Sequence, residues 1–117
     1  METFEKAKIA IKALDSKKGY NIKVFKIDDL TILGDYFIFA TGSSSTQVRA
    51  LADEVDEKMS ESGIEPNHIE GKSSGWILLD YGDVIIHVLG REEREFYALE
   101  KLWQDGQEID ISDIISE

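Results

Sequence analysis

The chain contains no cysteine, so neither a disulfide framework nor thiol chemistry is available to it. None of its apolar runs approaches the roughly 18–20 residues that a transmembrane helix requires. Its N-terminal stretch lacks the apolar core and the small-residue cleavage site of a signal peptide. We therefore expect a cytoplasmic protein. At 117 residues the chain is long enough for one hydrophobic core, and its 42% apolar and 32% charged residues are typical of a globular domain.

Basic residues are scarce outside the N-terminal region. The first 26 residues hold seven lysines and three acidic residues, whereas the remaining 91 hold six basic and 21 acidic residues, and the net charge is −11. Phosphate backbones are bound by clustered lysine and arginine, so little direct nucleic-acid binding is expected. A basic protein partner suits the negative electrostatic potential of such a chain. Charge alone does not separate that interpretation from one in which acidity serves only solubility.

The first half of the chain predicts one helix and two strands. Apolar residues recur at helical spacing from Phe4 to Leu14, with Thr3 as the N-cap and Gly19 as the stop. Residues 22–27 predict a strand that is exposed on part of one face, because lysines interrupt it. Residues 35–40 form a continuous apolar run, which is typical of a central strand buried on both faces.

A second helix and a hairpin are predicted next. Ser44 and Gln47 have capping-box spacing, and Gly63 followed by Pro66 ends the apolar helical stripe. After a short segment at residues 67–70, strands at 76–80 and 83–89 are separated by Tyr81-Gly82, where the glycine supplies a positive φ angle.

A third helix from Glu92 to Trp103 completes the predicted elements. The element order is α-β-β-α-β-β-β-α, so the fold class is α/β (α+β): a mixed five-stranded sheet with helices packed on it. We expect one domain over residues 1–103 and an acidic C-terminal tail over 104–117. The isoleucine spacing of that tail is compatible with a last short strand, a docking segment or disorder.

Most catalytic and metal-binding patterns are absent. Gly71-Lys72-Ser73 resembles the end of a phosphate-binding loop, but Pro66 stands where that loop needs a glycine and no helix follows. His68 and His87 lack zinc-site spacing, and His87 is expected to be a satisfied histidine on a strand. The serines at 43–45 lack the frame of a nucleophile elbow, and helix capping explains them. The sequence thus assigns no catalytic, cofactor-binding or metal-ligating residue.

One enzymatic alternative stays open. A strand followed by Gly42-Ser43 and a helix is how nucleotidyltransferases begin, with Ser43 near the nucleotide phosphates. Those enzymes also hold magnesium with two closely spaced carboxylates. Asp80 and Asp83 are the acidic residues on the hairpin, but a turn separates them, and local hydrogen bonds that fix the turn explain them better.

Two stretches resemble a known family. Residues 35–55 read DYFIFATGSSSTQVRALADEV, and the stretch from Gly71 to Trp103 begins with a G-x-x-x-G-W pattern and ends with F-Y-x-L-E-x-L-W. Both resemble the two signatures of the ribosomal silencing factor family (RsfS, also called Iojap or YbeB). The resemblance extends from the first helix to Trp103 and leaves out the acidic tail.

The resemblance implies a non-catalytic regulator of translation. Members of that family bind the large ribosomal subunit through its ribosomal protein number fourteen, at the intersubunit face. They thereby block subunit joining and repress translation when nutrients are short. The resemblance also implies a nucleotidyltransferase-like fold, a homodimer in the free state and, without a transit peptide, a bacterial cytoplasmic member.

The family's contact surface lies on the hairpin and the following helix. The matching positions in this chain are Trp76, Leu78, Asp80, Tyr81, Arg94, Tyr97 and Lys101. Trp76, Leu78 and Asp80 share one strand face by alternation, although Trp76 and Leu78 are also compatible with core positions. Phe96, Leu99 and Trp103 are expected in the core. Whether Trp76 or Tyr81 faces solvent depends on the tertiary structure.

Overall fold

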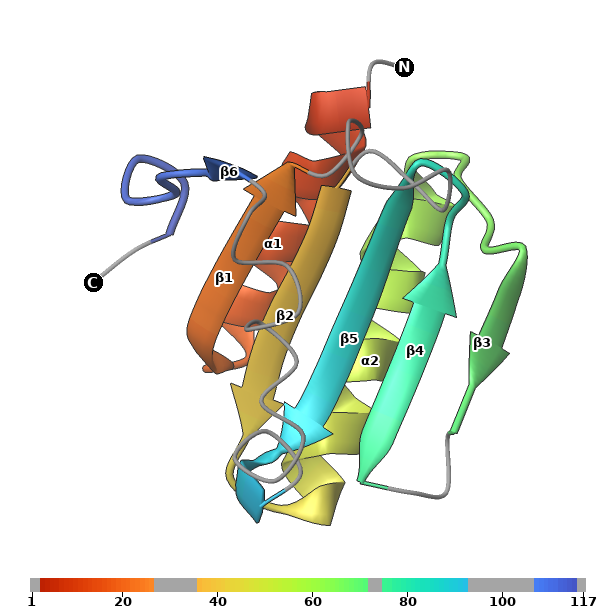
Figure 1. Ribbon diagram of the computed structural model, residues 1–117. Helices are drawn as coiled ribbons and strands as arrows, with labels where there is room; N and C mark the ends of the chain where they lie inside the picture. Colours follow the sequence, from red (N-terminus) through yellow and green to blue (C-terminus); the bar gives the residue numbers. More distant parts are fainter. Residues whose placement is uncertain (1–2, 27–35, 72–74, 93–106, 116–117) are drawn as a thin grey trace.

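The computed structural model describes residues 3–26, 36–71, 75–92 and 107–115 (Figure 1). Its elements, in chain order, are α1 (Thr3–Ser16), β1 (Tyr20–Lys26), β2 (Tyr36–Gly42), α2 (Ser45–Glu61), β3 (His68–Glu70), β4 (Trp76–Asp80), β5 (Val84–Gly90) and β6 (Gln107–Glu108). The first seven follow the predicted order. The predicted helix over residues 92–103 lies outside the described residues after its first position.

The strands form one mixed sheet in the order β3-β4-β5-β2-β1-β6. Strands β2 and β5 pair in parallel, and every other neighbouring pair is antiparallel. The predicted α+β class is confirmed, with a short sixth strand added to the expected five. Strand β2 lies inside the sheet with six consecutive buried residues, as its continuous apolar run predicted.

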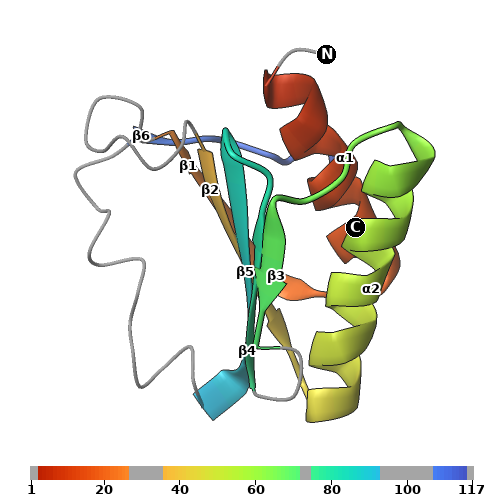
Figure 2. The ribbon, with the colours of Figure 1, turned by 90° about the vertical axis from the view of Figure 1, so that its right-hand side faces the viewer.

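Both described helices lie on the same face of the sheet, as Figure 2 shows from the side. We call this the helix face. Alternate residues of each strand point toward the helices, and the core that they form is almost entirely aliphatic. The strand residues of this core are Val24, Ile38, Ala40, Ile77, Leu79, Val84, Ile86 and Val88, and the helices add alanine, leucine, isoleucine, valine and methionine side chains.

Both ends of α2 follow the predicted capping pattern. The Ser44 hydroxyl accepts a hydrogen bond from the Gln47 N–H at 3.1 Å, and Gln47 Oε1 accepts from the Ser43 hydroxyl at 2.7 Å. The side-chain amide nitrogen of Gln47 also donates to the carbonyls of Lys17 and Lys18, which ties the start of α2 to the end of α1. At the other end, Gly63 adopts a φ of +79°, the conformation that glycine favours after a helix.

The described part of the C-terminal tail belongs to the sheet and the core. Strand β6 pairs with β1, and the Ile109 N–H donates to the Val24 carbonyl at 2.8 Å. Ile111 is buried against the helix-face core, and Ile114 packs beside it. Of the alternatives for the tail, a last short strand is the one present. The predicted boundary at residue 103 stays a prediction, but residues 107–115 extend the same unit.

Candidate partner-binding face

The sheet face opposite the two described helices carries a second apolar cluster that is mostly aromatic. We call it the aromatic face; its members are Phe25, Phe37, Phe39, Ile85 and Leu89, with Trp76 and Leu78 packed against them. Strand pairing places Leu78 opposite His87 and His87 opposite Phe39. A continuous row of aromatic and apolar side chains therefore crosses β4, β5 and β2.

Trp76 and Leu78 are the half-buried members of this face. Both alternate along β4 with the buried residues Ile77 and Leu79, which point toward the helices. A surface cavity of about 270 Å³ is lined by Trp76 and Leu78 together with Glu70 and Gly71. The predicted shared face of Trp76, Leu78 and Asp80 is confirmed. Partly exposed aromatic and leucine side chains beside a cavity are typical of a protein contact surface.

The carboxylate of Glu70 lines this cavity, and that of Asp80 lies on the same sheet face. Glu70 lies opposite Leu78 in the β3–β4 pairing, and Asp80 lies opposite His68, so all four side chains project from the aromatic face. His68 Nε2 is 2.8 Å from Glu70 Oε2, and its Nδ1 is 3.6 Å from Asp80 Oδ2. Strands β3 and β4 thus carry two carboxylates and one histidine on the sheet face that contains the cavity. The sequence interpretation missed Glu70; the pairing of residues 68–70 with 78–80 would have indicated it.

Tyr81 lies on the other side of the sheet from Trp76. It is 5% exposed and belongs to the helix-face core. Burial, together with the negative charges of Asp56 and Glu65, raises the pKa of its hydroxyl. Of the two aromatic residues that the sequence left undecided, Trp76 therefore faces the accessible surface, and we leave Tyr81 out of the proposed contact face.

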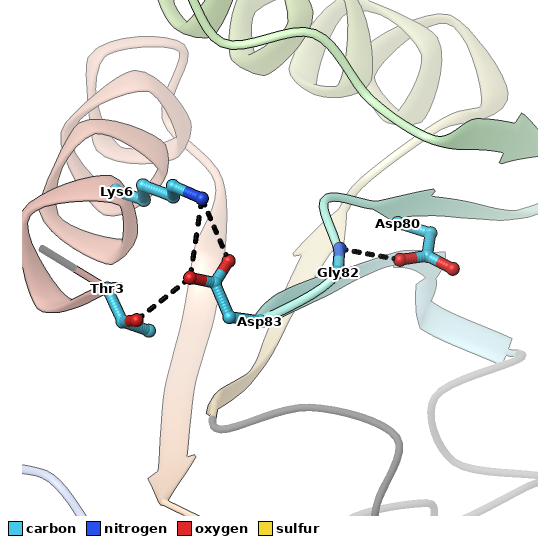
Figure 3. A network of polar contacts seen from close by, with 5 residues as sticks. All are labelled: Thr3, Lys6, Asp80, Gly82 and Asp83. Carbon is cyan, nitrogen blue, oxygen red and sulfur yellow. Dashed lines mark hydrogen bonds and ion pairs between the residues drawn. The ribbon is translucent and has the colours of Figure 1, made fainter. Parts of the chain in front are cut away.

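The hairpin turn differs from the predicted one by a single position. The Tyr81 N–H donates to the Val84 carbonyl at 2.9 Å, so the two central turn residues are Gly82 and Asp83 rather than Tyr81 and Gly82. Gly82 has a φ of +86°, which explains the need for glycine there. The Asp80 carboxylate accepts from the Gly82 N–H at 2.8 Å, as a turn-fixing residue is expected to do (Figure 3).

Asp83 has a different role from the predicted local one. Its carboxylate accepts from the Thr3 hydroxyl at 2.8 Å and pairs with the Lys6 ammonium at 3.1 Å, so it joins the hairpin to the first turn of α1 (Figure 3). Thr3, predicted as an N-cap, uses its hydroxyl for this contact. Burial by itself raises the pKa of Asp83, but the hydrogen bonds from Thr3 and Lys6 and the Lys6 charge outweigh it and hold that pKa below its ordinary value.

The residues of the enzymatic alternative do not converge. In the parallel β2–β5 pair, Tyr36 lies opposite Val84 at one end and Gly42 lies opposite Gly90 at the other. Ser43 follows the second end, whereas Asp83 precedes the first. Six residue steps separate the two ends, or roughly 20 Å at the rise of an extended strand. Figure 1 shows the hairpin turn and the start of α2 at opposite ends of the sheet.

A cavity of about 310 Å³ does lie beside the Gly-Ser turn. It is lined by Gly42, Ser43, Ser44, Ser45, Val48, Gly75, Gly90, Arg91 and Glu92. Gln47 already engages the hydroxyl of Ser43 and the cap of α2. Within the described ranges, no three or more histidine or acidic side chains gather closely enough to bind a metal ion. Neither described helix has the length and apolar character of a membrane span.

The remaining predicted contact residues, Arg94, Tyr97 and Lys101, lie outside the described residues, as do the predicted core residues Phe96, Leu99 and Trp103. Their roles stay predictions.

The described residues define a small α+β protein with an aliphatic helix face and an aromatic face on which Trp76 and Leu78 are half-buried. Over residues 1–117 the chain matches the family model described as "Ribosomal silencing factor during starvation". A ribosomal silencing factor from Halalkalibacterium halodurans is 35% identical over 117 residues, which cover 99% of this chain and 100% of that protein. One from Chromobacterium violaceum is 43% identical over 104 residues, or 88% of this chain and 85% of that protein.

The fold agrees with these relatives. A crystal structure of a protein from Chromobacterium violaceum superposes with a TM-score of 0.87 at 41% identity, over 96% of this chain and 93% of that one. The chain therefore belongs to the ribosomal silencing factor family. The resemblance seen in the sequence is confirmed, and with it a role in translation regulation. The nucleotidyltransferase-like description of the fold stays a prediction.

Proposed function

We propose that this protein binds the large ribosomal subunit in the bacterial cytoplasm, through the basic ribosomal protein number fourteen at the intersubunit face. A bound copy blocks joining of the small subunit and represses translation when nutrients are limited. The observation that carries the proposal is the half-buried pair Trp76 and Leu78 beside a cavity that Glu70 also lines. Family membership supports the ribosome as the target.

The chemistry of this surface suits a basic protein. Trp76 and Leu78 supply contact area that is removed from water on binding, and aromatic anchors of this kind contribute most of the affinity at many interfaces. Glu70 and Asp80 beside them attract lysine and arginine side chains. We expect these two carboxylates to speed association and to orient the partner, so the association rate falls as salt is raised.

The acidic outer surface of α2 supports selectivity for protein over RNA. Asp53, Asp56 and Glu57 lie along this helix, and no salt bridge pairs them with a cation among the described residues. Uncompensated negative charge is repelled by the phosphates that dominate a ribosomal surface. This helix surface therefore favours contact with a basic protein over contact with RNA.

Sedimentation through sucrose gradients tests the proposal. Added protein is expected to migrate with purified bacterial large subunits and to reduce the fraction of joined ribosomes. Trp76→Ala is expected to weaken binding at least tenfold while circular dichroism reports an intact fold. Tyr20→Ala is the matched control, because Tyr20 is the exposed large aromatic residue on β1, away from the cavity. Absence of comigration by the parent chain would overturn the proposal.

We propose that the protein acts without catalysis. The separation of Ser43 from Asp80 and Asp83 along the sheet supports this, because phosphoryl chemistry needs those groups around one metal ion. Titration calorimetry with a nucleoside triphosphate and magnesium is expected to show no heat of binding. Saturable binding would instead revive the enzymatic alternative. The homodimer implied by the family is tested separately by light scattering across a concentration range.

A further inference from the structure

His87 lies on β5 next to Trp76 and is 7% exposed. The indole N–H of Trp76 donates to His87 Nδ1 at 3.2 Å, and the two ring centroids are 6.0 Å apart. The two residues come from neighbouring strands, so the contact crosses the hairpin. A half-buried tryptophan at a contact surface thus has its one polar atom fixed by a buried histidine.

The imidazole ring is itself held in place from its other side. It stacks on Phe39 with centroids 4.9 Å apart and an interplanar angle of 13°, and the Phe37 ring lies 5.4 Å away. Rings packed in this way have little rotational freedom. The lone pair of Nδ1 therefore points in a fixed direction. Because the indole N–H of Trp76 donates to this lone pair, the orientation of the indole is fixed as well.

The arrangement requires the neutral tautomer with its proton on Nε2, because Nδ1 accepts a hydrogen bond. Burial lowers the pKa of His87 to about 4, so the ring is neutral at physiological pH. Its Nε2 is buried and has no hydrogen-bond partner among the described residues. An unpaired N–H in an aromatic cluster is destabilising, and a phenylalanine ring of similar shape would avoid it.

We propose that His87 is a positioning residue, which fixes the indole of Trp76 in the orientation that the ribosomal partner recognises. This inference rests on the proposed function. It predicts opposite effects of one substitution: an apolar ring at position 87 leaves the fold as stable as the parent or more so, and it weakens partner binding. If the histidine were purely structural, replacing it would lower both the stability of the fold and the affinity for the partner.

Two substitutions separate these possibilities. His87→Phe keeps a flat ring against Phe39 but removes the acceptor. His87→Asn loses the ring but places an amide oxygen close to the position of Nδ1, so it can still accept from the indole. Ile85→Val is the matched control, because Ile85 lies on the same strand and the same face.

Two measurements are made on each full-length chain. The indole N–H resonance of Trp76, assigned by its loss in Trp76→Phe, reports the hydrogen bond without any partner. Affinity for purified bacterial large subunits reports the function. We expect His87→Phe to shift the resonance upfield, to bind at least tenfold more weakly and to melt at the parent temperature or above. His87→Asn is expected to restore part of the shift and part of the affinity, and Ile85→Val to change neither.

Each other outcome overturns the inference. Parent-like binding by His87→Phe would show that the acceptor is not needed, and equal weakening of both variants with an unmoved resonance would show a packing effect. A His87→Phe chain that fails to fold would show that the fold itself needs the imidazole. Failure of the parent chain to bind would instead overturn the proposed function, whereas the resonance shift would still report the contact.

Discussion

The two faces of the sheet are built from alternate residues of the same strands and yet differ in kind. The helix face is aliphatic, and its strand residues, such as Ile38 and Ile86, are fully buried. The aromatic face contains phenylalanines, a buried histidine and the half-buried Trp76. Aliphatic side chains interdigitate closely with helices, whereas aromatic rings offer large, rigid areas for contact. The comparison indicates that both faces contain buried apolar side chains, and that the contact surface is confined to the half-buried Trp76 and Leu78 of the aromatic face.

The largest effect on stability is expected from the helix face. Ile86→Ala removes three carbon atoms from a fully buried position and is predicted to lower the free energy of unfolding by about 4 kcal/mol. Urea denaturation followed by circular dichroism measures the change. The comparison variant is Leu78→Ala, a half-buried position on the aromatic face, for which we expect about 1 kcal/mol together with weaker ribosome binding. Equal losses of stability would contradict the division of roles between the buried core position and the half-buried contact position.

A smaller loss of stability is expected when the pH is lowered, and it comes from His87 on the aromatic face. Burial lowers the pKa of His87 to about 4 from an ordinary value near 6.5. Between these pH values the unfolded chain binds the proton and the folded chain does not, so stability falls as pH falls through this window. The loss is about 3 kcal/mol, and His87→Phe is predicted to remove it.

Chemical denaturation at several pH values between 7 and 4 checks this prediction. The parent and His87→Phe chains share every other titrating group, so the difference between their two pH profiles isolates His87. Parallel profiles would mean that the histidine is protonated without penalty in the folded state, which would contradict its burial within the aromatic face.

The smallest effect concerns the contact that ties the hairpin to the helix layer. Asp83→Asn removes the charge that pairs with Lys6 and is predicted to lower the free energy of unfolding by about 1.5 kcal/mol. Because Asp83 has a lowered pKa, its contribution is present above its ordinary pKa and is lost as the pH falls through the folded value. Thermal denaturation at pH 7 and at low pH measures both effects.

A matched control uses an exposed ion pair. Glu108→Gln breaks the Lys23–Glu108 contact at 3.4 Å, where both side chains are about half exposed, and we expect less than about 0.5 kcal/mol. If Asp83→Asn were as mild as Glu108→Gln, the hairpin would not be anchored to α1 through this carboxylate.

Much of the fold could be predicted from local patterns. The continuous apolar run of β2 indicated a central strand, and Ser44 with Gln47 indicated the start of α2. Alternation placed Trp76, Leu78 and Asp80 on one face. These features depend on the 2.0 and 3.6 residue periods and on capping hydrogen bonds, which a few neighbouring residues determine.

The candidate site was less predictable, because its members come from strands that local patterns do not pair. The turn at Gly82 and Asp83 sets the hairpin register, so Leu78 faces His87 rather than Ile85. A shift of one position in the predicted turn moves each cross-strand partner by two residues but leaves each side chain on its face. The face of Trp76 was thus correct from the sequence, whereas its contact with His87 required the register.

By itself, the sequence determined the family, the element order and the alternation along β4, because each depends on neighbouring residues or on recognisable signatures. The tertiary structure decided which sheet face the helices cover, and therefore that Tyr81 is buried while Trp76 borders the surface. It also decided that Asp83 reaches Thr3 and Lys6, 77 or more positions away in the chain. The physical reason is that alternation assigns the residues of a strand to two faces but does not say which elements pack against each face. Only the packing of distant segments distinguishes one face from the other.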